Sequence, residues 1–261
     1  MKALGIAASG MLAQQTNVDV IANNIANANT SGFKAGRAAF QDLIYQSQRR
    51  EGALAADDGS ARPVGVDLGL GVATAGVVRL NTQGGLTETG NQLDMAIQGR
   101  GYFQIALPDG TMGYTRAGNF SLSPEGTIVT LDGYELDPGL VVPEDATGVE
   151  ISPDGVVSAY LPGATAPQEL GEITLAAFIN EAGLRPIGNN LMVETVASGE
   201  PIVAQAGDEG FGTLRQKFLE SSNVNVIQQL TELITAQRAY EMNSKAITTA
   251  DQMLQTVTSL R

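Results

Sequence analysis

VIQQLTELITAQRAYEMNSKAITTADQML, residues 226–254, has the pattern of a long helix. It lies within residues 213–261, a run of 49 residues without Gly or Pro, and such runs are typical of long helices. Its large apolar residues recur every seven positions, a spacing that keeps one helix face against a partner helix along its whole length. They are Val226, Leu233, Tyr240, Ile247 and Leu254, with Leu230 between the first two. A helix over 222–260 would be about 58 Å long, so we expect it to pack against something equally long.

The N-terminal segment has the same character. Residues 11–31 lack Gly and Pro, and apolar residues again lie seven apart. These are Leu4, Met11, Val18 and Ile25. Further apolar residues lie beside these heptads and widen each apolar stripe beyond a two-stranded seam: Leu12, Ile21, Ile227 and Ile234. The wider stripes indicate that each helix touches more than one partner.

The middle of the chain has the pattern of β structure. All ten Pro and 29 of the 31 Gly lie between residues 32 and 212. Short runs rich in β-branched and aromatic residues predict strands over 72–80, 102–107, 127–131, 156–160 and 173–178. Turn dipeptides at Asp109-Gly110, Glu125-Gly126, Asp132-Gly133 and Asp154-Gly155 predict that hairpins join the strands.

These patterns predict an α+β fold in which a discontinuous terminal coiled-coil domain accompanies a central all-β domain built of hairpins. We expect residues 1–44 and 212–261 to form the terminal helical domain and residues 72–211 the outer β domain. Residues 45–71 have little apolar content before Val66, so we expect an extended connector or arm there. Arg49, Arg50, Asp57, Asp58 and Pro63 belong to this connector.

Composition excludes several kinds of chemistry. The chain has no His, Cys or Trp, so thiol nucleophiles, imidazole bases and Ser-His-Asp triads are impossible. The net charge of −13 opposes binding to nucleic acid or to an anionic membrane. Most of this charge lies in residues 45–211, where 22 acidic residues face 7 basic ones, whereas both ends are nearly neutral. We expect no catalytic, cofactor or metal site. We also expect neither binding to nucleic acid nor insertion into a membrane.

No segment is apolar enough to predict a transmembrane helix, since the charge-free run 3–18 contains several polar residues. A signal peptide is an alternative interpretation of the first residues. The helix interpretation is favoured because the apolar spacing continues past any cleavage point.

An asparagine-rich stretch at residues 17–29 needs an explanation, since Asn is unfavourable inside a helix. Asn23, Asn24 and Asn27 belong to it. Two interpretations remain open: a solvated polar face, or amides that bond to neighbouring subunits in a packed array of helices.

The same stretch, Ala22-Asn-Asn-Ile-Ala-Asn27, resembles the signature of the flagellar axial proteins, the rod and hook subunits of bacterial flagella. Segments 93–104, 114–120, 222–226 and 236–245 agree with the same family, so the resemblance covers essentially the whole chain in order. The length, the connector after Tyr45 and the ending at 249–254 are most similar to subunits of the distal rod. The proximal F-type rod subunit and the hook subunits are the nearest alternatives.

The resemblance implies a structural subunit of the basal body that polymerises helically into a drive shaft and transmits torque from motor to hook. It implies contacts with other copies, with other rod and hook subunits, with the P and L rings, and with the flagellar type III export apparatus. It also implies a location in the periplasm, reached without a cleaved signal peptide. We expect the assembly interface to lie on the terminal helices, at the heptad residues named above together with Asn23, Asn24 and Asn27.

Other motifs give weaker signals. Gly69-Leu-Gly71 has the wrong spacing for a dinucleotide fingerprint, and Asp132, Glu135 and Asp137 are more simply a solvated acidic turn than a Ca²⁺ site. Tyr240 is most simply a packing residue. A secreted β domain on a helical stalk, forming a closed oligomer, is the rival class of protein, and an enzyme with an unrecognised carboxylate or Lys site ranks last.

Overall fold

A computed structural model describes residues 2–49, 64–163 and 166–259 of the chain. The contacts divide it into two compact units, which we call the helical unit (1–26, 36–78 and 225–261) and the sheet unit (27–35 and 79–224). Arg50, Asp57, Asp58 and Pro63 of the expected connector lie outside the described residues. The combination of terminal helices with a central β region confirms the predicted α+β class.

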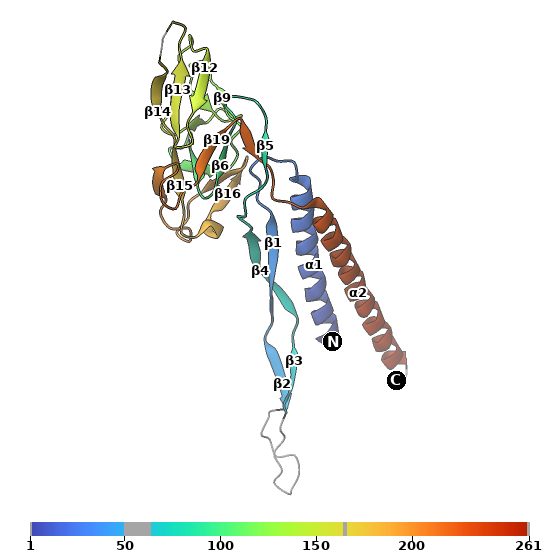
Figure 1. The fold of residues 1–261 in the computed structure, drawn as a ribbon. Coiled ribbons are helices and arrows are strands. Elements are labelled where there is room, and N and C mark those ends of the chain that lie inside the picture. Colours follow the sequence, from blue (N-terminus) through green and yellow to red (C-terminus); the bar gives the residue numbers. More distant parts are fainter. Residues whose placement is uncertain (1, 50–63, 164–165, 260–261) are drawn as a thin grey trace. The chain divides into compact units, whose positions relative to one another are not determined.

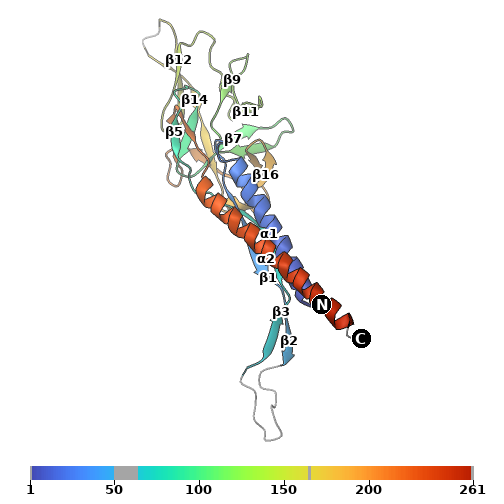
Figure 2. The same cartoon turned by 90° about the vertical axis from the view of Figure 1, so that its right-hand side faces the viewer.

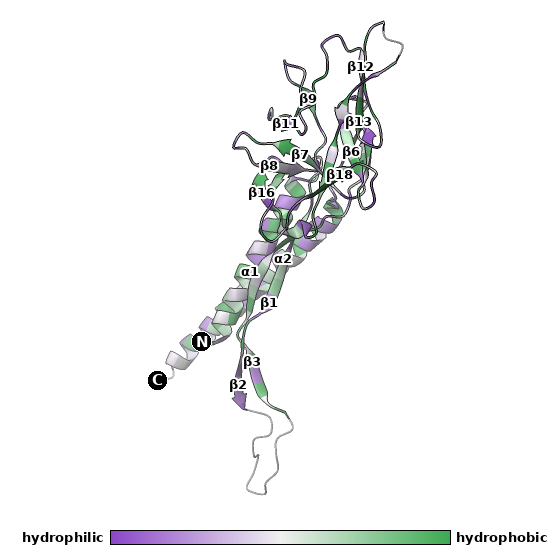
Figure 3. Cartoon of the chain, turned by 90° about the vertical axis from the view of Figure 1, so that its left-hand side faces the viewer, coloured by the Kyte–Doolittle hydropathy of each residue, from purple (hydrophilic) through white to green (hydrophobic). Residues whose placement is uncertain are grey.

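The helical unit contains both predicted helices, α1 (Lys2–Ala26) and α2 (Val226–Ser259). They lie side by side and run in opposite directions (Figures 1 and 2). Both helices carry hydrophobic and hydrophilic residues along their length (Figure 3). Asn225 caps α2, since its side-chain oxygen accepts from the backbone N–H groups of Ile227 and Gln228 at 3.1 and 3.2 Å.

Four strands complete the helical unit. β1 (Gly36–Asp42) pairs with β4 (Val72–Arg79), and β2 (Tyr45–Arg49) pairs antiparallel with β3 (Val66–Gly69). Backbone bonds between Leu43 and Gly71 and between Leu70 and Ile44 join the two pairs into one ribbon. The described ends of the expected connector are therefore strands rather than unpaired chain.

The sheet unit is built around a nine-stranded sheet with the order β16-β17-β8-β7-β11-β10-β9, while β15 pairs with β7 and β18. Its strands are β7 (Tyr102–Ala106), β8 (Met112–Thr115), β9 (Ser121–Leu122), β10 (Ile128–Val129), β11 (Glu135–Leu136), β15 (Thr174–Ala177), β16 (Arg185–Gly188), β17 (Leu191–Val193) and β18 (Ile202–Gln205). The 3-10 helix η1 (Glu181–Gly183) precedes β16. All described pairs in this sheet are antiparallel.

Three smaller sheets belong to the same unit. One contains β12 (Gly148–Ile151), β13 (Val156–Tyr160) and β14 (Gln168–Glu172), and the two others pair β6 (Met95–Gln98) with β19 (Thr213–Gln216) and β5 (Leu86–Glu88) with β20 (Phe218–Glu220). The sequence placed residues 212–224 with the terminal helices. In the structure these residues pair with strands that start more than a hundred positions earlier, a long-range pairing that no local pattern of Gly and Pro reveals.

The four predicted turns all close hairpins. Gly110, Gly126, Gly133 and Gly155 each donate a backbone hydrogen bond to the carbonyl three residues earlier, at 2.9 to 3.0 Å, and each has φ between 81° and 93°. That left-handed conformation suits Gly because it has no Cβ. Three of the turns share a Pro-acidic-Gly sequence, at 108–110, 124–126 and 153–155.

The core of the sheet unit is formed by two clusters of buried, mostly apolar side chains. Its large buried side chains include Met95, Ile97, Phe103, Ile105, Phe120, Ile128, Leu136, Ile173, Leu175 and Leu214. A second cluster gathers Tyr102, Tyr114, Phe178, Leu184 and Met192. No helix in the described part of the chain is long and apolar enough to cross a membrane.

Candidate assembly interface

Small and polar residues make the contact between α1 and α2. Ala236 and Ala250 on α2 are buried, and between them Asn243 lies so close to Gly10 that a Cβ added there would be 2.9 Å from the Asn243 amide nitrogen. Earlier on the same helix, Gln229 bonds to α1. The α2 residues that face α1 are spaced seven apart: Gln229, Ala236, Asn243 and Ala250. This heptad differs from the apolar heptad predicted from the sequence.

The apolar heptad of α2 is left largely uncovered. Val226, Leu230, Tyr240 and Leu254 are between 38% and 46% exposed, while Leu233 and Ile247 are half-buried. Four of these residues, Leu233, Tyr240, Ile247 and Leu254, follow the α1-facing heptad by four positions, which places them about 40° around the helix. Ile227 and Ile234 are more exposed still, at 79% and 51%. The described chain therefore leaves much of the apolar face of α2 partly exposed.

The predicted interface residues of α1 are only partly buried within the chain. Leu4, Met11, Val18 and Ile25 are half-buried, whereas the fully buried positions of this helix are Ala7, Ala13, Ile21 and Asn24. Leu12 is 66% exposed and Ile6 39% exposed. Asn23 is exposed and Asn27, just beyond the helix, is half-buried. The apolar stripe of α1 is thus only partly used by α2 and the neighbouring strands.

Asn24 is used entirely within the chain. It is 2% exposed, and its amide nitrogen donates to the Gly36 carbonyl at 2.8 Å and to the Gln229 side chain at 2.9 Å. Its side-chain oxygen accepts from the Gly36 backbone N–H at 2.8 Å. Neither interpretation from the sequence, a solvated face or a bond to another copy, describes this residue. The amide instead joins α1, β1 and α2, a role that depends on contacts 12 and 205 positions away in the chain.

A buried group of charged residues organises the sheet unit, and no sequence pattern predicted it. Lys34 Nζ lies 2.5 Å from one carboxylate oxygen of Glu220, and Arg116 Nε lies 3.0 Å from the other. The three side chains are 5%, 6% and 0% exposed. Burial lowers the pKa of Lys34, and its bond to Glu220 acts in the opposite direction. We call Lys34, Arg116 and Glu220 the charged cluster.

The charged cluster binds several backbone segments. Glu220 also accepts from the Gly84 N–H at 2.9 Å, and Lys34 donates to the Thr82 carbonyl at 2.8 Å. Arg116 Nη1 donates to the carbonyls of Gly99 and Gly101 at 2.9 and 2.6 Å. Since these groups come from distant parts of the sequence, the cluster ties together the two ends of the sheet unit.

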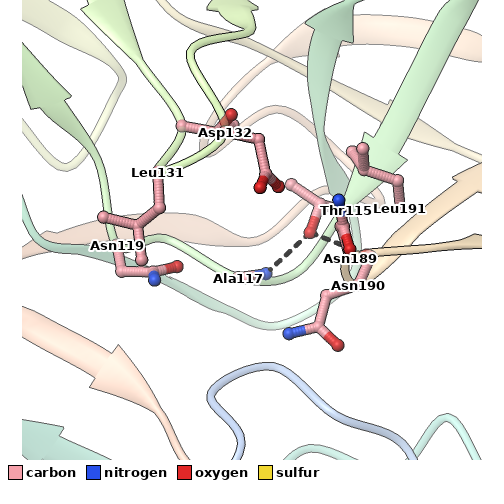
Figure 4. A pocket seen from close by; sticks show the side chains of 9 residues that line it. Thr115, Ala117, Asn119, Leu131, Asp132, Asn189, Asn190 and Leu191 are labelled. Atoms are coloured by element: carbon pink, nitrogen blue, oxygen red, sulfur yellow. Dashed lines mark hydrogen bonds between the residues drawn. The ribbon is translucent and has the colours of Figure 1, made fainter.

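A pocket of about 200 Å³ in the sheet unit has a polar lining (Figure 4). It is lined by Thr115, Ala117, Asn119, Thr130, Leu131, Asp132, Asn189, Asn190 and Leu191. The Thr115 hydroxyl donates to the Asn190 carbonyl at 2.9 Å and accepts from the Ala117 N–H at 3.1 Å, and the Asn190 amide donates to the Ser31 carbonyl at 3.1 Å. These polar groups hold loops together rather than face a reacting group.

The acidic turn at Asp132, Glu135 and Asp137 is solvated at its first two members, which are exposed. Within residues 2–49, 64–163 and 166–259, no group of three or more acidic side chains is placed to hold a metal ion.

Three family models match the chain in order. Residues 4–34 match "Flagella basal body rod protein", residues 96–159 match "Flagellar hook protein FlgE/F/G D1 domain", and residues 215–260 match "Flagellar basal body rod FlgEFG protein C-terminal". The matched ranges include nearly all of α1 with the asparagine-rich stretch, all of α2, and five of the nine strands of the large sheet.

Curated relatives match over the full length. The chain is 54% identical to the flagellar basal-body rod protein FlgG of Caulobacter vibrioides over 261 residues, all of both chains. It is 46% identical to FlgG of Borreliella burgdorferi, over 100% of this chain and 99% of the relative. Identity to FlgF of Caulobacter vibrioides is 34%, over 93% and 91% of the two chains. Because the G-type relative is much more similar than the F-type relative of the same organism, the chain belongs to the FlgG family of flagellar basal-body rod proteins.

Proposed function

We propose that this chain is a structural subunit of the flagellar basal-body distal rod and acts without catalysis. The observation that carries the proposal is the uncovered apolar heptad of α2. An exposed stripe of this length is unfavourable in water, and repeated copies supply the partner helices that cover it. In this arrangement the subunits stack helically into a tube that transmits torque from motor to hook.

The terminal helices form the inner, packed part of such a tube, and the acidic segment 45–211 faces outward. The heptad residues of α1 and α2 make the contacts between copies, and Asn23 and Asn27 lie beside them. Other rod and hook subunits adjoin the ends of the tube. We further propose that the P and L rings surround it in the periplasm and that the flagellar type III apparatus exports the chain without cleaving a signal peptide.

The test replaces Leu233 or Ile247 by Asp in the full-length chain. A charge at either position would be buried in the seam between copies, which is strongly unfavourable. We expect both variants to remain monomeric at concentrations where the unmodified chain forms straight tubes, as seen by light scattering and negative-stain microscopy. Near-ultraviolet circular dichroism from the buried tyrosines should be unchanged, because the sheet unit contains neither residue.

Thr249→Asp is the matched control. Thr249 is exposed and lies two residues from Ile247, so it points to another side of α2. This variant should assemble like the unmodified chain. If Leu233→Asp forms normal tubes, the apolar heptad is not part of the interface between copies. If the unmodified chain is a small closed oligomer at every concentration, a stalked binding module is favoured instead.

A further inference from the structure

A second cavity of the sheet unit, of about 230 Å³, adjoins the charged cluster. It is lined by Lys34, Asn81, Gln83, Gly99, Arg100, Gly101, Tyr102, Arg116 and Glu181. Three of these residues are cations, in a chain whose net charge is −13. Three positive side chains around one cavity are unusual in so acidic a chain, and they indicate a site for a negatively charged group.

The charges around the cavity do not balance. Lys34 and Arg116 share the single carboxylate of Glu220, while Arg100 pairs with Glu181 at 3.5 Å. Three cations therefore face two carboxylates. The excess positive charge belongs to the buried cluster, where water compensates it poorly.

Hydrogen-bond donors at the cavity remain available. The bonds that Arg116 makes within the described residues use Nε and Nη1, so its Nη2 retains two donors. Asn81 adds a half-buried amide and Arg100 a side chain that is 63% exposed. The Tyr102 hydroxyl donates to Glu181 at 3.3 Å, and the Tyr102 ring centroid lies 5.9 Å from Arg116 Cζ. Guanidinium and amide groups that line one cavity are suited to binding an oxygen anion.

We propose that this cavity binds one oxyanion, a carboxylate or phosphate group, between Arg116, Arg100 and Asn81. The anion balances the excess charge of the cluster and accepts the remaining donors of Arg116. The same chemistry is offered by a free anion and by an Asp or Glu side chain of a second copy of this chain.

The first experiment titrates the monomeric full-length chain with sodium phosphate and, separately, sodium acetate, with sodium chloride holding the ionic strength constant. The buried Nε–H of Arg116 is bonded to Glu220 and so gives a slowly exchanging nuclear magnetic resonance signal. We expect a saturable shift of this signal and a rise in Tm with phosphate or acetate but not with chloride.

Arg100→Gln tests the site without disturbing the charged cluster, because Arg100 is exposed. It should weaken anion binding about tenfold, the value of one charge-assisted hydrogen bond. Arg185→Gln is the control: Arg185 is exposed on β16 and does not line the cavity, so binding should not change. A shift that stays linear and equals that with chloride, or unchanged binding by Arg100→Gln, would overturn the proposal.

A second experiment distinguishes a free anion from a carboxylate of another copy as the occupant of the cavity. Only this second experiment rests on the proposed function. Tube formation is followed by light scattering in phosphate and in chloride at equal ionic strength. If a carboxylate of another copy occupies the cavity, phosphate should slow assembly of the unmodified chain, and Arg100→Gln should assemble more slowly in chloride. Phosphate binding with unchanged assembly assigns the site to a free anion. Absence of binding to the monomer refutes the site even if tubes form normally.

Discussion

Glu220→Gln removes the negative charge of the buried cluster while keeping the shape of the side chain. Glu220 is 0% exposed and contacts Lys34 at 2.5 Å and Arg116 at 3.0 Å, so the variant leaves two buried cations without a counter-charge. Breaking a buried ion pair in this way costs about 3 to 5 kcal/mol. Since whole domains are stable by only about 5 to 15 kcal/mol, we expect the sheet unit to be close to unfolding.

The assay is urea unfolding of the full-length chain, followed by near-ultraviolet circular dichroism. Tyr114 packs edge-on against Phe178 with ring centroids 4.8 Å apart, and Tyr102 also contacts that ring, so the signal reports the sheet unit. Glu181→Gln is the control, because it removes a carboxylate from the more exposed pair with Arg100. It should lower the free energy of unfolding by about 1 kcal/mol or less.

A double variant sharpens the test. Lys34→Met in the Glu220→Gln background removes one of the two uncompensated cations, so it should recover part of the lost stability. If Glu220→Gln alone lowers the free energy of unfolding by less than about 1 kcal/mol, the buried cations do not depend on the carboxylate. The assignment of the charged cluster as the organising feature of the sheet unit would then be wrong.

Three further outcomes are expected. Asn24→Ala should lower the free energy of unfolding of the monomeric helical unit by about 2 to 3 kcal/mol, measured by far-ultraviolet circular dichroism, because three intrachain hydrogen bonds are lost. A loss of assembly with unchanged monomer stability would contradict this. Gly84→Ala should severely destabilise the sheet unit in thermal melts, since its Cβ would lie 1.8 Å from the Ser221 carbonyl oxygen. Gly85→Ala, with nothing within 4 Å, should be nearly neutral. Above about pH 10 the sheet unit should lose stability, because burial, with the nearby Glu194, raises the pKa of Tyr114 to about 12 while an unfolded tyrosine ionises near 10. The loss is at most about 1.4 kcal/mol per pH unit for each such tyrosine, and equal slopes for Tyr114→Phe and the unmodified chain would contradict the assignment.

Local patterns predicted the elements that depend on local chemistry. The two helices follow from long runs without Gly or Pro, and the four acidic-Gly turns follow from the left-handed backbone at their glycines.

Local sequence patterns could not predict contacts between residues that are far apart in the chain. The apolar heptad of α2 was correctly placed on a helix, but the face that α2 turns to α1 is set by Gln229, Ala236, Asn243 and Ala250, whose small or polar side chains resemble a surface in the sequence. Asn24 illustrates the same limit, because its three hydrogen bonds are made with two residues of other elements, Gly36 on β1 and Gln229 on α2. Glu220 gave no signal at all, since nothing around it indicates that two cations will meet it.

The pairing of β6 with β19 has a consequence for the order of folding. Gln98 and Thr213 are partners about 115 positions apart, so the sheet unit closes only by bringing the ends of a long loop together. Closure over that distance is slow, whereas the hairpins inside the loop form early. A chain interrupted just before Thr213 would contain the hairpins inside the loop but lack the closing strands β19 and β20. Incomplete chains should therefore remain open to proteases, and completion of the chain becomes a condition for resistance to them.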